Sequence, residues 1–275
     1  AVGLGRGFAV HKALDQAGAV AGPLLVAGVA ALTGTLWPAM AVLIVPGAAA
    51  LLVLAWIRRK MPDPAVSQNA SVPPASTPAR EAPHPRWRWR SAASLPTVFW
   101  LFAAACGAAT AGLVTYGVIS YHLTRDQVVP VAAVPLIYAA AMAAAAFAAL
   151  LSGWLFDRHG GRVLLSLPIL VAVVPALAFT NSAVVAIVGV LIWGAAVGVQ
   201  DSTVKALVAD LVPTTRRATA YGVFAAVQGA AAIAGGTLAG ALYDQSLPVL
   251  IATVAAIQLT ALILLAVTLR RHHHS

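Results

Sequence analysis

A short charged segment at residues 151–165, LSGWLFDRHGGRVLL, interrupts an otherwise apolar part of the sequence. Its charged and small residues lie close together: Gly153, Asp157, Arg158, His159, Gly160, Gly161 and Arg162. A carboxylate here can accept hydrogen bonds from a helix N-terminus or pair with a cation such as Arg216 or Arg217, and the glycines permit a tight turn. The segment therefore predicts either a contact that forms and breaks during a conformational change, or a simple polar turn between two apolar segments.

Three aspartates, Asp15, Asp201 and Asp210, lie in or near apolar segments. Acidic side chains inside a membrane are costly, so each is a candidate functional group. Asp15 and Asp210 have cations nearby in the sequence, and we expect both at structural interfaces. Asp201 lies four residues before Lys205, which predicts an ion pair on one helical face. Alternatively, Asp201 faces a cavity in which it takes up and releases a proton.

Four further polar or amphipathic side chains occur within apolar segments: Tyr116, Trp193, Gln200 and Gln228. Together with Asp201 they are candidates for lining a substrate or proton path. The alternative for each is a hydrogen bond to a neighbouring helix that serves packing alone.

Small residues mark two further segments. Gly18 and Gly22 are four residues apart, which places both on one face of a helix, and Pro23 weakens the helix beside them. These three residues predict either a hinge or a close-packing face. Packing is favoured for the glycines of a later segment, Gly222, Gly229, Gly236 and Gly240.

Signals for enzymes and metal sites are missing from the sequence. It contains no H-E-x-x-H, no G-x-x-x-x-G-K-[ST] and no G-x-S-x-G motif. Cys106 is the single cysteine, so no cysteine pair can hold a metal ion. We therefore expect no enzymatic activity, no cofactor and no metal centre.

The composition is that of a membrane protein. Hydrophobic residues make up 61% of the 275 residues and charged residues only 9%, whereas a soluble domain carries about 25% charged residues. The net charge of +9 is spread over short clusters between apolar runs, so the predicted partner is the lipid bilayer and not nucleic acid.

The apolar runs are long enough to cross a bilayer as helices, because a span needs about 20 residues and lipid offers the backbone no hydrogen-bond partners. Eight runs are found, at about 13–33, 37–57, 95–120, 131–155, 163–180, 183–204, 218–242 and 247–269. The predicted fold is an all-α polytopic helical bundle.

The cations predict the orientation of these spans. With eight spans, all of the 17 lysines and arginines except Arg125 fall on the side of both termini. Cationic loops stay cytoplasmic, which places both termini and the charged segment at 151–165 in the cytoplasm. Residues 58–94 are rich in Pro, Ser and Ala and predict a cytoplasmic linker.

The charged segment resembles the Gly-x-x-x-Asp-Arg-x-Gly-Arg-Arg loop motif of the major facilitator superfamily, although Gly161 stands where that motif has a basic residue. GAVAGP at 18–23 resembles the fifth-helix motif of the family without its last two glycines. Residues 200–224 and 235–245 are similar to the tenth and eleventh helices of bacterial members.

The resemblance implies the last eight helices of a twelve-helix transporter. Residues 1–57 would be the last two helices of the N-terminal half, 58–94 the linker, 95–271 the C-terminal six-helix bundle and 272–275 a tail or tag remnant. The first four helices would be absent, in a fragment or a truncated gene product, and a complete transporter would need them.

The function implied is secondary active transport of a small molecule across the plasma (inner) membrane by alternating access, coupled to an ion gradient such as protons. The alternative is a truncated membrane remnant or assembly partner that transports nothing.

Overall fold

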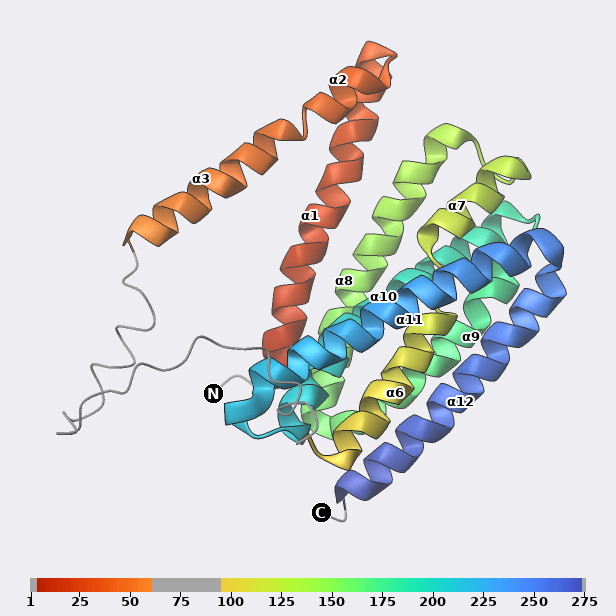
Figure 1. Ribbon diagram of the computed structural model, residues 1–275. Helices are drawn as coiled ribbons and strands as arrows, with labels where there is room; N and C mark the ends of the chain where they lie inside the picture. The colour runs from red at the N-terminus through yellow and green to blue at the C-terminus, as the bar shows by residue number, and fades with distance from the viewer. Residues whose placement is uncertain (1–3, 61–94, 274–275) are drawn as a thin grey trace. The chain divides into compact units, whose positions relative to one another are not determined.

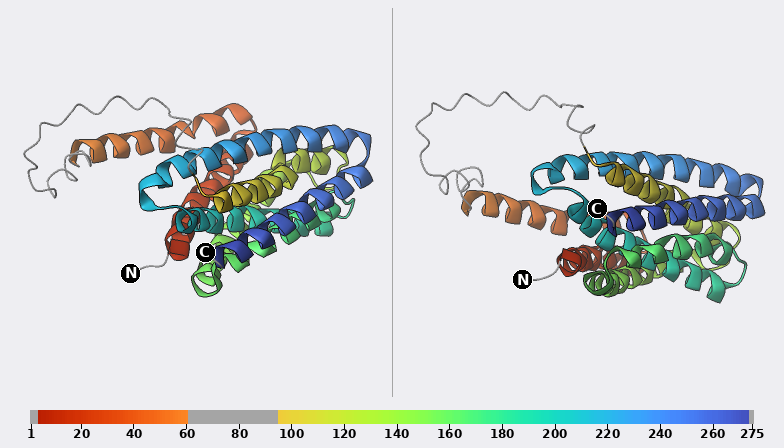
Figure 2. Two further views of the ribbon diagram at one scale, coloured as in Figure 1. Left: turned by 60° about the horizontal axis from the view of Figure 1, so that its bottom comes forward. Right: turned by 90° about the horizontal axis from the view of Figure 1, so that it is seen from below.

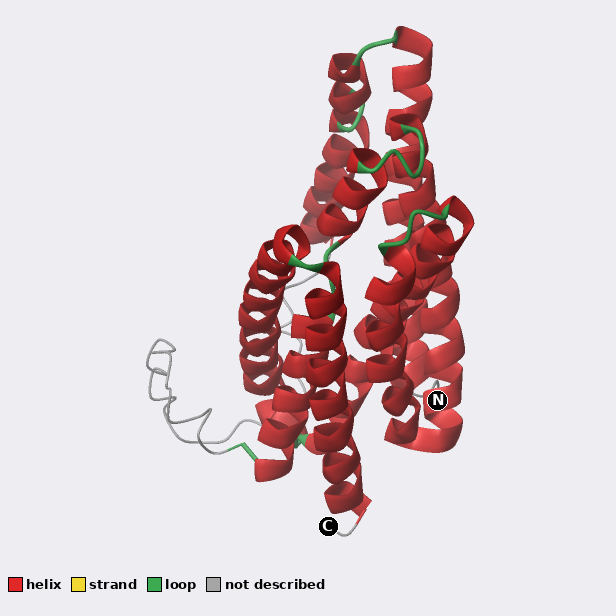
Figure 3. Cartoon of the chain, turned by 90° about the vertical axis from the view of Figure 1, so that its right-hand side faces the viewer, coloured by secondary structure: helices red, strands yellow, loops and turns green. Residues whose placement is uncertain are grey.

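The computed structural model describes residues 4–60 and 95–273, and every regular element in these ranges is a helix (Figures 1 and 3). This confirms the all-α prediction. By their contacts the described residues form two compact units, residues 4–24 with 95–273, and residues 25–60. The predicted linker at 58–94 begins inside a helix, and from residue 61 it lies outside the described residues.

The smaller unit contains three helical segments: the end of α1 (Leu4–Thr33), α2 (Leu36–Ala41) and α3 (Ile44–Lys60). Gly34 separates α1 from α2 with a φ of 68°, a conformation that glycine adopts without steric cost. No residue of α3 is buried among the described residues, and the helix is apolar until its basic last turn, Arg58, Arg59 and Lys60. The predicted division of the chain at residues 57, 94 and 271 stays a prediction.

The larger unit contains residues 4–24 of α1 and a helical bundle. Its helices are α6 (Thr97–Gly112), α7 (Tyr116–Arg125), α8 (Val134–His159), α9 (Ser166–Ala178), α10 (Ala183–Leu211), α11 (Arg217–Gln245) and α12 (Leu247–His273). Three short 3-10 segments connect them: η1 (Val131–Ala133), η2 (Gly160–Leu165) and η3 (Thr214–Arg216). Residues 274–275 of the predicted tail lie outside the described residues.

The bundle has two layers. Helices α6, α11 and α12 pack together in one layer, and α8, α9 and α10 form the other (Figure 2). Close approach between α10 and α8 depends on small residues, because a Cβ at Gly194 or Gly198 would meet the backbone of Ala141 or Ala145. Small residues at such contacts are typical of helices that associate inside a membrane.

Seven helical stretches are long and apolar enough to cross a membrane, judged by length and composition over the described residues. One of them, Val131–Ala178, has 48 residues, which is about 72 Å of helix and more than twice the thickness of a hydrocarbon core. This stretch turns back at η2, so it contains the fourth and fifth predicted spans as separate helices, α8 and α9. The protein is therefore a multi-pass membrane protein.

The third predicted span, at 95–120, differs from the structure in one respect. The sequence predicts a continuous helix, but α6 ends at Gly112 and α7 begins at Tyr116 and continues to Arg125. Two β-branched residues, Val114 and Thr115, follow Gly112 at this break. Glycine and β-branched side chains both weaken a helix, which is the local reason for the interruption.

Candidate functional site

The interruption between α6 and α7 frees backbone groups inside the bundle, and a tryptophan binds one of them. The buried indole Nε1 of Trp193 on α10 donates a hydrogen bond of 2.8 Å to the carbonyl oxygen of Val114. The amide of Leu113 bonds to the carbonyl of Thr110 at 3.1 Å. An unpaired peptide group in a membrane is costly, so Trp193 stabilises a non-helical backbone that would otherwise be unfavourable there.

Aromatic side chains surround the break. The rings of Tyr116 and Trp193 have centroids 5.5 Å apart, and Tyr138 on α8 lies 4.8 Å from Tyr116. The hydroxyl of Tyr116 donates to the carbonyl of Val134 at 2.8 Å. These bonds fix the orientation of Tyr116 and Trp193 between α7, α8 and α10.

A cavity of about 240 Å³ lies at this place. The described residues that line it are Thr110, Leu113, Val114, Thr115, Tyr116, Trp193 and Ala232. Beside it, the amide of Gln228 on α11 donates to the hydroxyl of Thr110 at 3.3 Å. None of these residues is charged, so the site offers aromatic faces and hydroxyl groups but no ion-pair partner.

The structure thus brings together three of the five predicted path residues: Tyr116 and Trp193 at the cavity wall and Gln228 through Thr110. Sequence reasoning did not identify Thr110 or Thr115. A threonine inside an apolar helix usually bonds to its own backbone, and only the position of the break shows that these two border a cavity. The one available signal was Gly112 with two β-branched residues, Val114 and Thr115, shortly after it.

Asp201 and Gln200 lie elsewhere on α10. Asp201 follows Trp193 by eight residues, about 12 Å along the helix. Its Oδ2 lies 2.7 Å from the Nζ of Lys12 on α1, and the same Nζ lies 2.8 Å from Asp15. The partner of Asp201 among the described residues is therefore Lys12, whereas spacing along the helix predicted Lys205, which is exposed.

The 153–162 loop lies at the end of the bundle where α8 turns into α9. Gly160 has a φ of 63° and a ψ of −154°, a backbone conformation restricted to glycine. The guanidinium of Arg158 lies 3.8 Å from the ring centroid of Trp154, one turn earlier on α8. Gly153 is buried within α8, whereas Asp157 and Arg162 are exposed. The conformational role of the loop stays a prediction.

Gly161, the departure from the family motif, has a structural reason. A Cβ at this position would lie 2.6 Å from Cδ2 of Leu269 on α12 and 3.3 Å from Leu207 on α10. The glycine therefore lets the loop contact the ends of two other helices. A long basic side chain could not leave position 161 without displacing Leu269.

Gly18, Gly22 and Pro23 all lie within α1, which continues through the proline. A Cβ at Gly18 or Gly22 would meet no other atom within 4 Å in the part of the chain that is described. No described residue therefore packs closely against Gly18 or Gly22. The role of Gly18, Gly22 and Pro23 as a hinge stays a prediction. Of the four later glycines, Gly222, Gly229 and Gly240 are equally open, and a Cβ at Gly236 would make an ordinary contact with Thr115 at 3.5 Å. The close contact is made instead by Gly235, which the prediction did not include, against Ala111 of α6.

Comparison with known proteins agrees with this architecture. The model of the Major Facilitator Superfamily matches residues 3–199 and 114–275. The uncharacterized protein Mb2288 of Mycobacterium bovis is 46% identical to this chain over 264 residues, as is the uncharacterized protein Rv2265 of Mycobacterium tuberculosis. The alignment covers 96% of this chain and 62% of each relative, so the chain spans less than two thirds of their length. Two family matches that together extend over almost all residues show that this chain belongs to the major facilitator superfamily of membrane transporters.

Proposed function

We propose that the whole protein moves a small molecule across the membrane by alternating access, and that the cavity at the α6–α7 break holds part of the substrate. The observation that carries this proposal is the interrupted helix, with its Val114 carbonyl held by Trp193 and an aromatic-lined cavity beside it. Secondary transporters place their binding sites at broken helices near the middle of the membrane, where irregular backbone lines a cavity.

The lining favours an uncharged, ring-containing substrate. Tyr116 and Trp193 offer flat apolar faces for stacking, and the hydroxyl groups of Thr110 and Thr115 can orient a polar edge. A volume of about 240 Å³ is below the usual range for sites that enclose a drug-sized ligand. The cavity therefore holds a compact molecule or one ring of a larger one.

Alternating access requires contacts that close one end of the path and then break. The ion pair between Lys12 on α1 and Asp201 on α10 is one candidate, since it joins two helices that are far apart in the sequence. The 153–162 loop is another. Coupling to a proton gradient would then use Asp201, because protonating this carboxylate removes the charge that binds Lys12.

The proposed binding site can be tested with the whole protein in detergent. A panel of neutral aromatic compounds, each with a charged analogue of the same ring, is screened by thermal shift. Neutral compounds should raise the melting temperature of the native protein and of Trp100→Phe, a control at an exposed ring on α6. They should have no effect on Trp193→Leu, in which both the stacking face and the bond to Val114 are missing.

Stabilisation of Trp193→Leu by the same compounds, or a preference for the charged analogues, would rule out this binding site. A compound that passes the screen is then tested for counterflow in proteoliposomes. Binding without counterflow would favour the alternative of a membrane protein that does not transport.

A further inference from the structure

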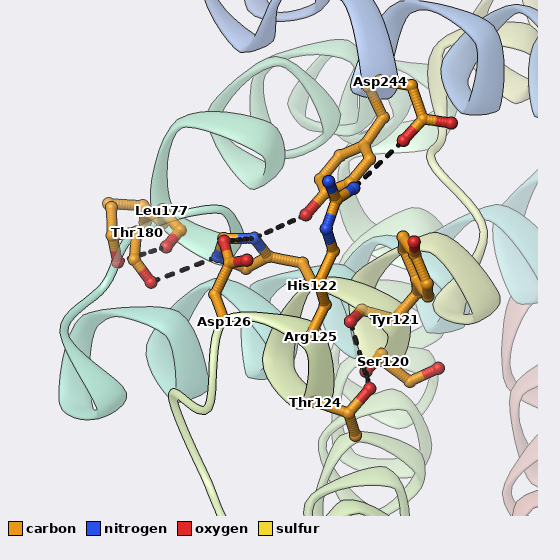
Figure 4. A network of polar contacts seen from close by, with 10 residues as sticks. Ser120, Tyr121, His122, Thr124, Arg125, Asp126, Leu177, Thr180 and Asp244 are labelled. Carbon is orange, nitrogen blue, oxygen red and sulfur yellow. Dashed lines mark hydrogen bonds and ion pairs between the residues drawn. The ribbon is translucent and has the colours of Figure 1, made fainter.

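A buried histidine, His122, lies on α7 (Figure 4), which is at the other end of α8 from the 153–162 loop (Figure 1). The Nδ1 of His122 on α7 lies 2.9 Å from the hydroxyl oxygen of Tyr243 on α11 and 3.1 Å from Oδ2 of Asp126. Its Nε2 lies 3.4 Å from the carbonyl oxygen of Thr180, in the turn between α9 and α10. One imidazole therefore joins three parts of the bundle.

The chemistry of these partners restricts how the ring can be protonated. A carbonyl oxygen only accepts hydrogen bonds, so Nε2 carries a hydrogen and donates it to Thr180. Nδ1 then faces two different partners. The hydroxyl of Tyr243 can donate to an unprotonated Nδ1 or accept from a protonated one, whereas the carboxylate of Asp126 can only accept. Because a charge-assisted hydrogen bond is the stronger one, a protonated Nδ1 donates to the carboxylate in preference to the hydroxyl.

We propose that His122 is a proton-binding site, in which Nδ1 accepts a bond from Tyr243 when neutral and donates to Asp126 when protonated. Each state has a partner in place, so neither leaves a buried nitrogen without a hydrogen bond. The bond that forms on protonation joins His122 to Asp126, the residue that directly follows α7, and the bond that is lost joins α7 to α11. Proton binding thus replaces a contact between two helices with a contact between α7 and the end of its own chain segment.

The surroundings give the proton a route to water. The side chain of His122 is 1% exposed, but that of Asp126 is 39% exposed, so the carboxylate can take a proton from solvent and pass it to the buried ring. The other charged and titratable groups that face this site are Arg125 and Tyr121 on α7 and Asp244 on α11. Arg125 and Asp244 pair at 3.1 Å, so their charges largely cancel near the ring.

The site is distinct from Asp201, because α7 and the α9–α10 turn lie at the other end of the bundle from η2 and the loop. Proton binding at His122 does not depend on the proposed function. Its use in transport does, as the loosening of α7 from α11 would then open this end of the path. Phe179 packs edge-on against the imidazole, with ring centroids 5.4 Å apart.

Nuclear magnetic resonance of the whole protein, with histidine rings labelled at nitrogen, tests this directly. One imidazole signal, absent from His122→Gln, should change from that of a ring with an unprotonated Nδ1 to that of a doubly protonated ring as the pH is lowered, and the midpoint of this change is compared between variants. Asp126→Asn should move the midpoint to lower pH by about 1 unit, because the protonated ring loses its anionic partner. Tyr243→Phe should move it to higher pH, by about half a unit, because the neutral ring loses its hydrogen-bond donor.

The double variant Arg125→Gln/Asp244→Asn is the matched control, since it removes a neighbouring α7–α11 ion pair without changing the net charge. Its midpoint should stay near that of the native protein. A His122 signal that does not titrate, or midpoints that shift in the same direction in Asp126→Asn and Tyr243→Phe, would overturn the proposal. If His122→Gln does not fold, the signal that Tyr243→Phe moves identifies the ring. A failure to detect transport would count against the proposed function and leave this titration unchanged.

Discussion

Trp193 combines two roles that are usually carried by different residues. Its indole nitrogen holds the carbonyl of Val114 at the interrupted helix, and its ring forms part of the cavity wall. The non-helical backbone and the aromatic surface are therefore positioned by the same side chain. Trp193→Leu removes both, which is why this variant alone cannot separate binding from local folding and the exposed Trp100 is needed as a control.

The Lys12 ammonium binds two carboxylates at once, and its removal should destabilise the protein. Lys12→Met leaves Asp201 as a partly buried anion without its cation, which we expect to cost about 1–3 kcal/mol and to lower the melting temperature of the whole protein. Lys12→Met/Asp201→Asn should recover most of this loss. Lys205→Met is the control and should change stability by about 0.5 kcal/mol or less, because its side chain is exposed.

An equal loss in Lys205→Met and Lys12→Met would contradict this prediction and return Asp201 to the partner expected from helical spacing. The comparison needs only thermal unfolding, so it does not require a known substrate. Because thermal unfolding does not involve transport, the result tests the ion pair independently of any role of Asp201 in proton coupling.

At the scale of helices, the contact between α10 and α8 depends on the missing side chains of Gly194 and Gly198. A methyl group at Gly198 would meet the carbonyl oxygen of Ala145, so Gly198→Ala should force the helices apart and cost about 1–3 kcal/mol. Gly229→Ala on α11 meets no atom within 4 Å and should stabilise its helix by about 0.5–1 kcal/mol. Thermal unfolding of the two variants should therefore show changes of opposite sign.

If Gly198→Ala is as stable as the native protein, α10 and α8 are not held at the separation that their backbones show. Both variants replace glycine by alanine within a helix, so the intrinsic preference of alanine for helices acts equally on both. The difference between their stabilities then reports the contact with the neighbouring helix, which exists at Gly198 and not at Gly229.

The sequence predicted the helices far better than their contacts. Hydrophobic runs locate the spans because lipid requires every backbone group to be bonded within its own helix, and the loop around Gly160 is marked by its charges. Contacts between helices have no comparable signal. Lys12 and Asp201 are almost 190 residues apart, so local spacing favoured Lys205 instead.

The sequence predicted only part of the candidate site, again because contacts between helices have no local signal. Tyr116, Trp193 and Gln228 are unusual in apolar helices and were identified by type, whereas Thr110 became relevant only through the bond to Gln228. No sequence pattern distinguishes His122, because a lone histidine near a helix end has many structural roles. Asp126 lies only four residues further along the chain, but the second partner, Tyr243, is visible only once α7 and α11 are packed together.

At the scale of the whole molecule, the distribution of cations predicts which end of the bundle faces the cytoplasm. Single cysteines at Gln127 and His159, both exposed positions at opposite ends of the bundle, are introduced into the whole protein with Cys106→Ala. A membrane-impermeant thiol reagent should label position 127 from outside intact cells and position 159 only after the membrane is opened. Labelling of both positions from the same side would contradict the arrangement of α7 and α8, and reversed labelling would contradict the orientation.

The contact of Gly161 with Leu269 carries an evolutionary consequence. A chain with the basic residue of the family motif at this position needs room for it, and in this protein the end of α12 occupies that room. Relatives that keep the basic residue should therefore carry a smaller side chain at the position matching Leu269, or at the one matching Leu207. In an aligned set of family sequences the loop position and the last turns of α12 and α10 should covary, although more than a hundred residues separate the loop from Leu269.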